Sequence, residues 1–166
     1  LATLQDLIQS PLIPSPVKEA ASLCASFERR NSATVGGNIA CRRDDSYLGA
    51  LFSVMGVKTY AVTPHGEGEK SVEDYFPTTC RRLILYFILD PRKDGWVKRF
   101  GNTVSSHAAL IAAESDGRYA LSVKGSQMVI GDTPEIYKDV EYVSDMFGSA
   151  EYKKYLASIV FGLRRK

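Results

Sequence analysis

The chain contains 166 residues, enough for one domain or two small ones. Its 21 Lys and Arg residues nearly balance its 19 Asp and Glu residues, so the formal net charge is only +2. A field this weak gives no argument for nucleic-acid binding, and no apolar run approaches the roughly 18 residues of a transmembrane helix. Nucleic acid and membrane are therefore not expected as partners.

Cysteine and histidine are few and scattered. Cys24, Cys41 and Cys80 form no C-x-x-C pair, so neither a zinc site nor an iron–sulfur cluster is encoded. Unpaired cysteines suit a reducing compartment, which predicts a cytoplasmic protein. His65 and His107 stand alone, and we expect them to be surface or packing residues rather than metal ligands.

Two short helices are predicted before residue 25. Thr3 is placed to cap the first, and Ser15 followed by Pro16 is a good start for the second. Apolar side chains recur at helical spacing in both segments, at Leu4, Leu7 and Ile8 and then at Val17, Ala20, Ala21 and Cys24.

A third helix and a hairpin are predicted after residue 45. Ser46 can cap a helix that Gly56 ends, with an apolar stripe between them. Residues 57–62 are rich in β-prone side chains, and the 63–68 segment is typical of a hairpin loop. Ser71 is expected to begin a short turn.

The second half of the chain contains four predicted strands and a helix. The apolar run at 83–89 predicts a buried strand, and 96–100 predicts the next one. Residues 119–123 alternate as in a half-buried strand, and 128–130 form another short one. Ser149 can cap a terminal helix whose expected buried stripe is Tyr152, Tyr155, Leu156, Ile159, Val160 and Leu163.

One stretch carries most of the functional information: residues 30–40, Arg-Asn-Ser-Ala-Thr-Val-Gly-Gly-Asn-Ile-Ala. Adjacent glycines permit a positive φ or a close backbone approach, and successive N–H groups in such a turn can bind an anion. Taken by itself, a Gly-Gly pair is usually a plain turn. The surrounding residues add weight to the functional interpretation.

This stretch resembles the R-N-x-A-T-[IV]-G-G-N-I signature of the FAD-binding subunits of molybdenum hydroxylases, which include xanthine dehydrogenase and carbon monoxide dehydrogenase. The resemblance extends from Leu4 to Leu163 and includes a terminal S-x-x-Y motif at Ser149. It implies an α+β fold. Residues 1–82 would be the second part of the FAD-binding domain, and 83–166 a C-terminal flavoprotein subdomain with a small antiparallel sheet and helices. The resemblance also decides between helix and strand for residues 106–114. Their alanines favour a helix, but the family has a strand there, so we expect a strand.

The same resemblance assigns the cofactor contacts. Thr34 would donate its hydroxyl to a phosphate oxygen, and the N–H groups of Val35, Gly36 and Gly37 would face the diphosphate of FAD. The amide of Asn38 would bridge the phosphate and the ribityl chain. A side chain of any size at Gly37 would displace the cofactor. The chain offers no catalytic dyad or triad and no metal site, which suits a protein whose chemistry resides in a flavin.

Arg30 and Cys24 allow two roles each. Arg30 would either offset diphosphate charge or pair with Asp44 or Asp45 to brace the loop. Cys24 occupies a position where relatives often have a flavin-contacting Phe. Here we expect it to be a packing residue, with flavin contact as the alternative.

Two further positions depart from the family pattern. Relatives carry Ser-Asp after the loop, and this chain has Ser-Tyr, with Asp44 and Asp45 close enough to substitute for the missing carboxylate. A family lysine aligns near Gly101, so it is either missing or replaced by Lys98 or Arg99. Ile84 matches an apolar position near the flavin ring and is otherwise a core strand residue.

The family's N-terminal FAD subdomain, with its own Gly-rich loop, has no counterpart in this sequence, which begins Leu-Ala-Thr without methionine. We therefore expect a piece of a longer subunit that holds half of a FAD site and is colourless when isolated. The implied function is electron transfer from iron–sulfur clusters through FAD to NAD or another acceptor. A molybdopterin-binding large subunit and an iron–sulfur small subunit would be the partners. The alternative is a non-enzymatic assembly or interaction module with a decayed flavin site.

Overall fold

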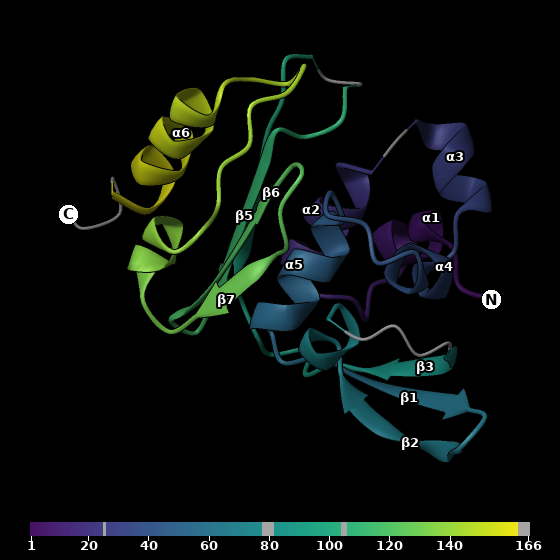
Figure 1. Cartoon of the computed structure of the whole chain (residues 1–166). Helices are drawn as coiled ribbons and strands as arrows, with labels where there is room; N and C mark the ends of the chain where they lie inside the picture. The colour runs from purple at the N-terminus through teal and green to yellow at the C-terminus, as the bar shows by residue number, and fades with distance from the viewer. Residues whose placement is uncertain (25, 78–81, 104–105, 163–166) are drawn as a thin grey trace.

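The computed structural model describes residues 1–24, 26–77, 82–103 and 106–162. Short helices occupy the first third of the chain, two antiparallel sheets follow, and a longer helix ends it (Figure 1). The helices and 3-10 helices are α1 (Leu4–Gln9), α2 (Ser15–Ser22), α3 (Phe27–Ser32), α4 (Val35–Ala40), α5 (Tyr47–Val54), η1 (Glu73–Tyr75), η2 (Pro134–Lys138) and α6 (Ala150–Gly162). The strands are β1 (Lys58–Thr63), β2 (Gly66–Ser71), β3 (Leu83–Ile88), β4 (Trp96–Phe100), β5 (Leu110–Ser115), β6 (Arg118–Val123) and β7 (Val129–Gly131).

The predicted caps of α1 and α5 are present, whereas the N-cap of α2 is one residue earlier than predicted. Thr3 and Asp6 form a reciprocal capping box at the start of α1. Ser46 accepts the N–H of Gly49 at 3.0 Å at the start of α5. α2 begins at Ser15 itself, because Pro14 is its N-cap and no side chain caps it.

A three-stranded antiparallel sheet with the order β2-β1-β3 contains the predicted hairpin. β3 was expected to be a buried strand, and that expectation is wrong: Leu83 is 66% exposed and Leu85 52% exposed. β3 is an edge strand, bonded to β1 on one side, so only Ile84 and Phe87 pack on the core. The expected boundary after residue 82 falls between β1 and β3, which pair in this sheet. The division into 1–82 and 83–166 stays a prediction.

A four-stranded antiparallel sheet, β4-β5-β6-β7, forms the centre of the second half. β6 was expected to be half buried, but Ala120 and Leu121 are both fully buried. α5 covers one face of this sheet, and α6 with η2 covers the other (Figure 1). The second half of the 106–114 segment lies in β5, so Ala112 and Ala113 stand in a strand between two covered faces, while Ala108 and Ala109 precede it.

One hydrophobic cluster joins the two halves of the chain. It includes α1, α2, α4 and α5 from the first half and side chains of β4, β5 and β6 from the second. α5 is buried along its whole length and lies at the centre of this arrangement (Figure 1). The connection into α5 is therefore held where the helices meet the second sheet.

The terminal helix α6 buries a different stripe from the one predicted. Tyr152 and Tyr155 are exposed, whereas Lys153, Ala157 and Val160 are buried. Lys153 is tolerated inside because its Nζ donates to two backbone carbonyls and lies 2.8 Å from Asp145. Leu163 lies outside the described residues. Among those that are described, no helix has the length and apolar character needed to cross a membrane.

Candidate functional site

The Gly-Gly stretch begins a helix and is not a turn. Thr34 is the N-cap of α4, and its Oγ1 accepts the N–H of Gly37 at 3.0 Å. Neither Gly36 nor Gly37 has a positive φ. The sequence interpretation of a turn was wrong because Thr34 supplies a helix cap just before the glycines.

The backbone amides at this helix start are partly occupied. Val35 donates its N–H to the carbonyl of Ala2 at 3.0 Å, and Gly37 donates to the Thr34 hydroxyl. Two of the three amides expected to face a diphosphate therefore already have acceptors within the chain. A Cβ on Gly36 would meet no atom within 4 Å, so the chain surface at that residue is open.

A side chain at Gly37 would crowd the cap of its own helix. A Cβ placed there would lie 2.9 Å from Oγ1 of Thr34, the atom that caps α4. A side chain at Gly37 therefore disturbs the cap whether or not a cofactor is bound, which corrects the simpler expectation that it acts only by displacing the cofactor.

A cavity of about 730 Å³ opens beside Asn38, and we call it the Asn38 cavity. Its wall consists of the end of α2, the start of α3, Asn38 itself, the connection into α5 and residues 106–107. Asn38 uses its Oδ1 to accept the Ser46 hydroxyl at 2.8 Å. Its Nδ2 has no partner in the described part of the chain, so this donor remains for a ligand.

Asp45 lies in the same cavity and is strongly held. Its side chain is 8% exposed, and Arg43 donates to both carboxylate oxygens, at 2.6 and 2.9 Å. His107 Nδ1 lies 2.6 Å from Oδ2. Burial raises the pKa of Asp45, but the hydrogen bonds from Arg43 and His107 and the charge of Lys124 outweigh it and lower the pKa to about 2. Asp45 is thus a fixed anion at neutral pH.

The contacts of Arg30 support a bracing role, with partners other than those expected. Its Nε donates to Gln5 at 3.4 Å, and its Nη1 donates to the carbonyls of Ser22 and Cys24. It therefore ties α3 to α1 and to the end of α2, in place of the expected pairing with a carboxylate of the loop.

Cys24 is a packing residue that also borders the Asn38 cavity. It is 6% exposed, and its Sγ donates to the Ala20 carbonyl at 3.4 Å. Burial raises the pKa of the Cys24 thiol to about 12, so it is a neutral thiol and no nucleophile. Cys41 is exposed and free, and Cys80 lies outside the described residues.

Two positions at which the sequence departs from the signature it resembles lie in contact. The hydroxyl of Tyr47 accepts a hydrogen bond at 2.9 Å from Nε of Arg99, one of the two expected replacements for the lysine of that pattern. The other, Lys98, lies over the ring of Trp96. Ile84 packs on the core from β3 and does not line the Asn38 cavity.

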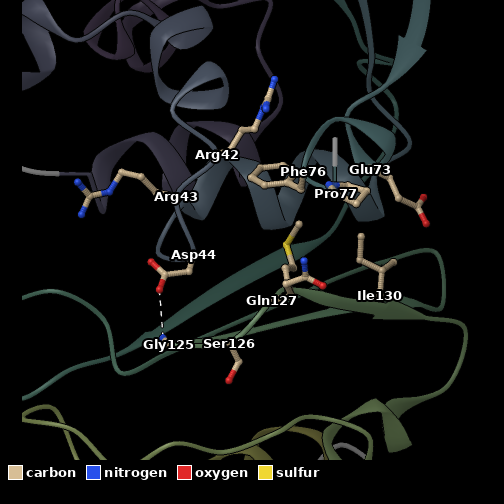
Figure 2. Close-up of a pocket in the computed structure, with 11 residues that line it drawn as sticks. Arg42, Arg43, Asp44, Glu73, Phe76, Pro77, Gly125, Ser126, Gln127 and Ile130 are labelled. Carbon is tan, nitrogen blue, oxygen red and sulfur yellow. Dashed lines mark hydrogen bonds between the residues drawn. The ribbon is translucent and has the colours of Figure 1, made fainter. Parts of the chain in front are cut away.

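A second cavity, of about 600 Å³, lies on the other side of the connection between α4 and α5. Figure 2 shows Phe76 and Ile130 on its wall, while the guanidinium groups of Arg42 and Arg43 point in different directions. Asp44 accepts a backbone N–H of the β6–β7 turn at 3.1 Å (Figure 2) and pairs with a lysine at the end of β6. The connection therefore separates two cavities and is fixed to the second sheet.

The site residues predicted from sequence are only partly brought together. Asn38 and Asp45 share the Asn38 cavity, whereas Thr34 caps α4, Arg30 braces α3 and Ile84 belongs to β3. Sequence reasoning missed His107 and Arg29, which reach this cavity from distant segments. No sequence signal marks His107, because 62 residues separate it from Asp45. Within the described ranges, no three His, Cys, Asp or Glu residues are grouped as metal ligands would be.

Comparison with known proteins gives a fold and a distant sequence relative. No protein-family model matches the chain. The uncharacterized protein YgfM of Escherichia coli K12 is 28% identical over 178 residues, which cover 96% of this chain and 68% of that protein.

Solved structures share the fold. Carbon monoxide dehydrogenase from Hydrogenophaga pseudoflava, in a form that lacks the Mo-pyranopterin moiety, matches with a TM-score of 0.82 and 19% identity over 96% of this chain and 70% of that one. Quinoline 2-oxidoreductase from Pseudomonas putida 86 matches at 0.81 with 17% identity, over 96% and 69% of the two chains. Reconstituted carbon monoxide dehydrogenase from Oligotropha carboxidovorans matches at 0.77 with 19% identity, over 98% and 70%. The expected α+β fold with antiparallel sheets is confirmed.

Proposed function

We propose that this chain is the FAD-binding part of an electron-transfer flavoprotein subunit in a molybdenum-hydroxylase complex. The observation that carries the proposal is the Asn38 cavity. It lies beside the residues that resemble the family signature, in a fold shared with carbon monoxide dehydrogenase and quinoline 2-oxidoreductase. FAD, when bound, would supply the redox chemistry, and the protein would bind and orient it.

The residues present suit a phosphate-bearing cofactor. The cavity offers Nδ2 of Asn38 as a donor without a protein partner, and Arg29 makes no ion pair in the described part of the chain. Gly36 leaves open space where a Cβ would stand, which allows close approach to the start of α4. We propose that Asn38, Arg29 and the α4 start hold the polar part of FAD.

The assembly follows from the same proposal. Electrons would arrive from iron–sulfur clusters on a small subunit, after oxidation of a substrate on a molybdopterin-binding large subunit. They would leave for NAD or another acceptor. We propose a cytoplasmic location, which suits the free thiols of Cys24 and Cys41.

A second candidate is a non-enzymatic assembly or interaction module. It is favoured by the amides of Val35 and Gly37, which already have acceptors within the chain. Tyr47 and Cys24 stand where the resembled family has Asp and Phe, and the loss of these two side chains also favours the module. FAD binding by the chain distinguishes this candidate from the first.

The test is titration of FAD to about 1 mM into the 166-residue chain, followed by difference absorbance of the flavin, because half of a FAD site binds weakly and releases FAD during purification. Asn38→Asp keeps an oxygen that can accept the Ser46 hydroxyl but replaces the free donor with a negative charge. Because a hydrogen bond to a charged group contributes about 1.5 to 3 kcal/mol, affinity should fall roughly ten-fold or more. Asn31→Asp is the matched control, since Asn31 is exposed on α3 and does not line the cavity.

Saturable FAD binding that Asn38→Asp weakens and Asn31→Asp preserves supports the flavoprotein function. Equal losses in both variants would indicate a general charge effect and count against the Asn38 cavity as the site. Absence of saturable binding to the wild-type chain would favour the module.

A further inference from the structure

His107 reaches the Asn38 cavity from the segment before β5 and contacts the opposite half of the molecule. Its Nδ1 lies 2.6 Å from Oδ2 of Asp45, and the edge of its ring faces Phe147. A carboxylate can only accept, so Nδ1 carries the proton in this contact. Nε2, on the far side of the ring, has no partner among the described residues.

Charged groups surround the Nδ1 side of the ring. Asp45 and Arg43 form an ion pair with two hydrogen bonds, and Lys124, at the end of β6, pairs with Asp44 at 2.7 Å. The charges of these four groups sum to zero. Nζ of Lys124 also lies 3.9 Å from Oδ2 of Asp45. Nη2 of Arg43 lies 3.2 Å from Nδ1. A neutral ring with Nδ1 protonated presents a lone pair at Nε2.

We propose that His107, oriented by Asp45, is a cofactor-binding residue that accepts a hydrogen bond at Nε2 from an O–H or N–H group of FAD. This inference rests on the proposed function and deepens it. FAD offers such donors along its ribityl chain and at the imide edge of its ring. Asp45 is then a positioning residue, because it sets which nitrogen of His107 faces the ligand.

Two near-isosteric substitutions separate this role from a structural one. His107→Gln places an acceptor oxygen near the position of Nε2 but does not reproduce Nδ1. His107→Asn places a donor near Nδ1, where it can still bond Asp45, but leaves nothing at Nε2. A binding role predicts that Gln retains FAD affinity and Asn loses about five-fold, as expected for one hydrogen bond. A purely structural bond to Asp45 predicts the reverse order.

Circular dichroism of wild type and of both variants checks that the fold is retained, so that a change in affinity reports the contact at Nε2.

The outcomes separate this inference from the function on which it rests. Wild-type binding with a loss in His107→Asn and retention in His107→Gln supports the inference. FAD binding that is equal in wild type and His107→Asn overturns the role of His107 and leaves the flavoprotein function standing. Absence of saturable binding to the wild-type chain overturns both.

Discussion

Asp45→Asn should be among the more costly polar substitutions in this protein. The side chain is 8% exposed and bonds Arg43 and His107, with Lys124 3.9 Å away. Replacing the carboxylate by an amide removes the charge that these groups surround while nearly preserving shape. The connection into α5 would then lose its strongest tie to the segment that holds His107.

The magnitude follows from the carboxyl group itself. Its pKa is lowered from 3.8 to about 2, because the hydrogen bonds from Arg43 and His107 and the nearby positive charges outweigh burial. A lowering of this size corresponds to roughly 2 to 3 kcal/mol of folding free energy at neutral pH. Since the folded pKa lies below the unfolded one, this stability is complete above the unfolded value. It is lost as pH falls through the range from 3.8 to about 2.

Urea unfolding of wild type and Asp45→Asn at neutral and acid pH measures the effect. We expect a gap of about 2 kcal/mol near pH 7 that closes as pH approaches about 2. Asp90→Asn is the control, because the pKa of Asp90 is also about 2, through hydrogen bonds from Arg92, on an exposed turn. Solvent screens that pair, so its loss should change stability much less. A gap below about 0.5 kcal/mol, or one that persists unchanged in acid, would refute the reasoning.

Two further predictions concern α4 and the thiols. Gly37→Ala should lower the free energy of unfolding by about 1 kcal/mol, because its Cβ would press on the Thr34 cap, whereas Gly36→Ala should be neutral or stabilising by up to about 1 kcal/mol. Urea unfolding measures both, and equal effects would contradict the assignment of the open position. A maleimide at neutral pH should label Cys41 and spare Cys24, whose thiol is buried with a pKa raised to about 12. Mass spectrometry locates the label, and modification of Cys24 in the folded chain would show that α2 opens.

Local sequence signals predicted the elements that depend only on residues close together in the chain. Thr3, Ser46 and Ser149 were recognisable as caps because a hydroxyl before an apolar periodic run satisfies orphan amides. Gly56, with φ of +66°, ends the segment after α5 as predicted. The hairpin was visible from its turn residues. These are properties of neighbours in the chain, and no distant contact is needed to produce them.

Burial could not be predicted with the same success. β3 is apolar enough for an interior strand, yet it lies at a sheet edge, and the sequence does not say how many strands flank it. Lys153 is absent from the predicted stripe of α6, yet it is buried, because Asp145 and the carbonyls of Lys124 and Val143 satisfy its ammonium group. β6 is buried from Ala120 to Val123 because α5 and α6 cover both of its faces.

The sequence by itself determined the α+β class, most helix starts and the stretch from Thr34 to Asn38 as the place to look for a cofactor. The tertiary structure decided that this stretch is a helix start whose amides are partly occupied. It also joined Asn38, Asp45 and His107 around one cavity. The reason is physical: caps and periodicity act within a few residues, whereas a cavity is made by segments that only packing brings together.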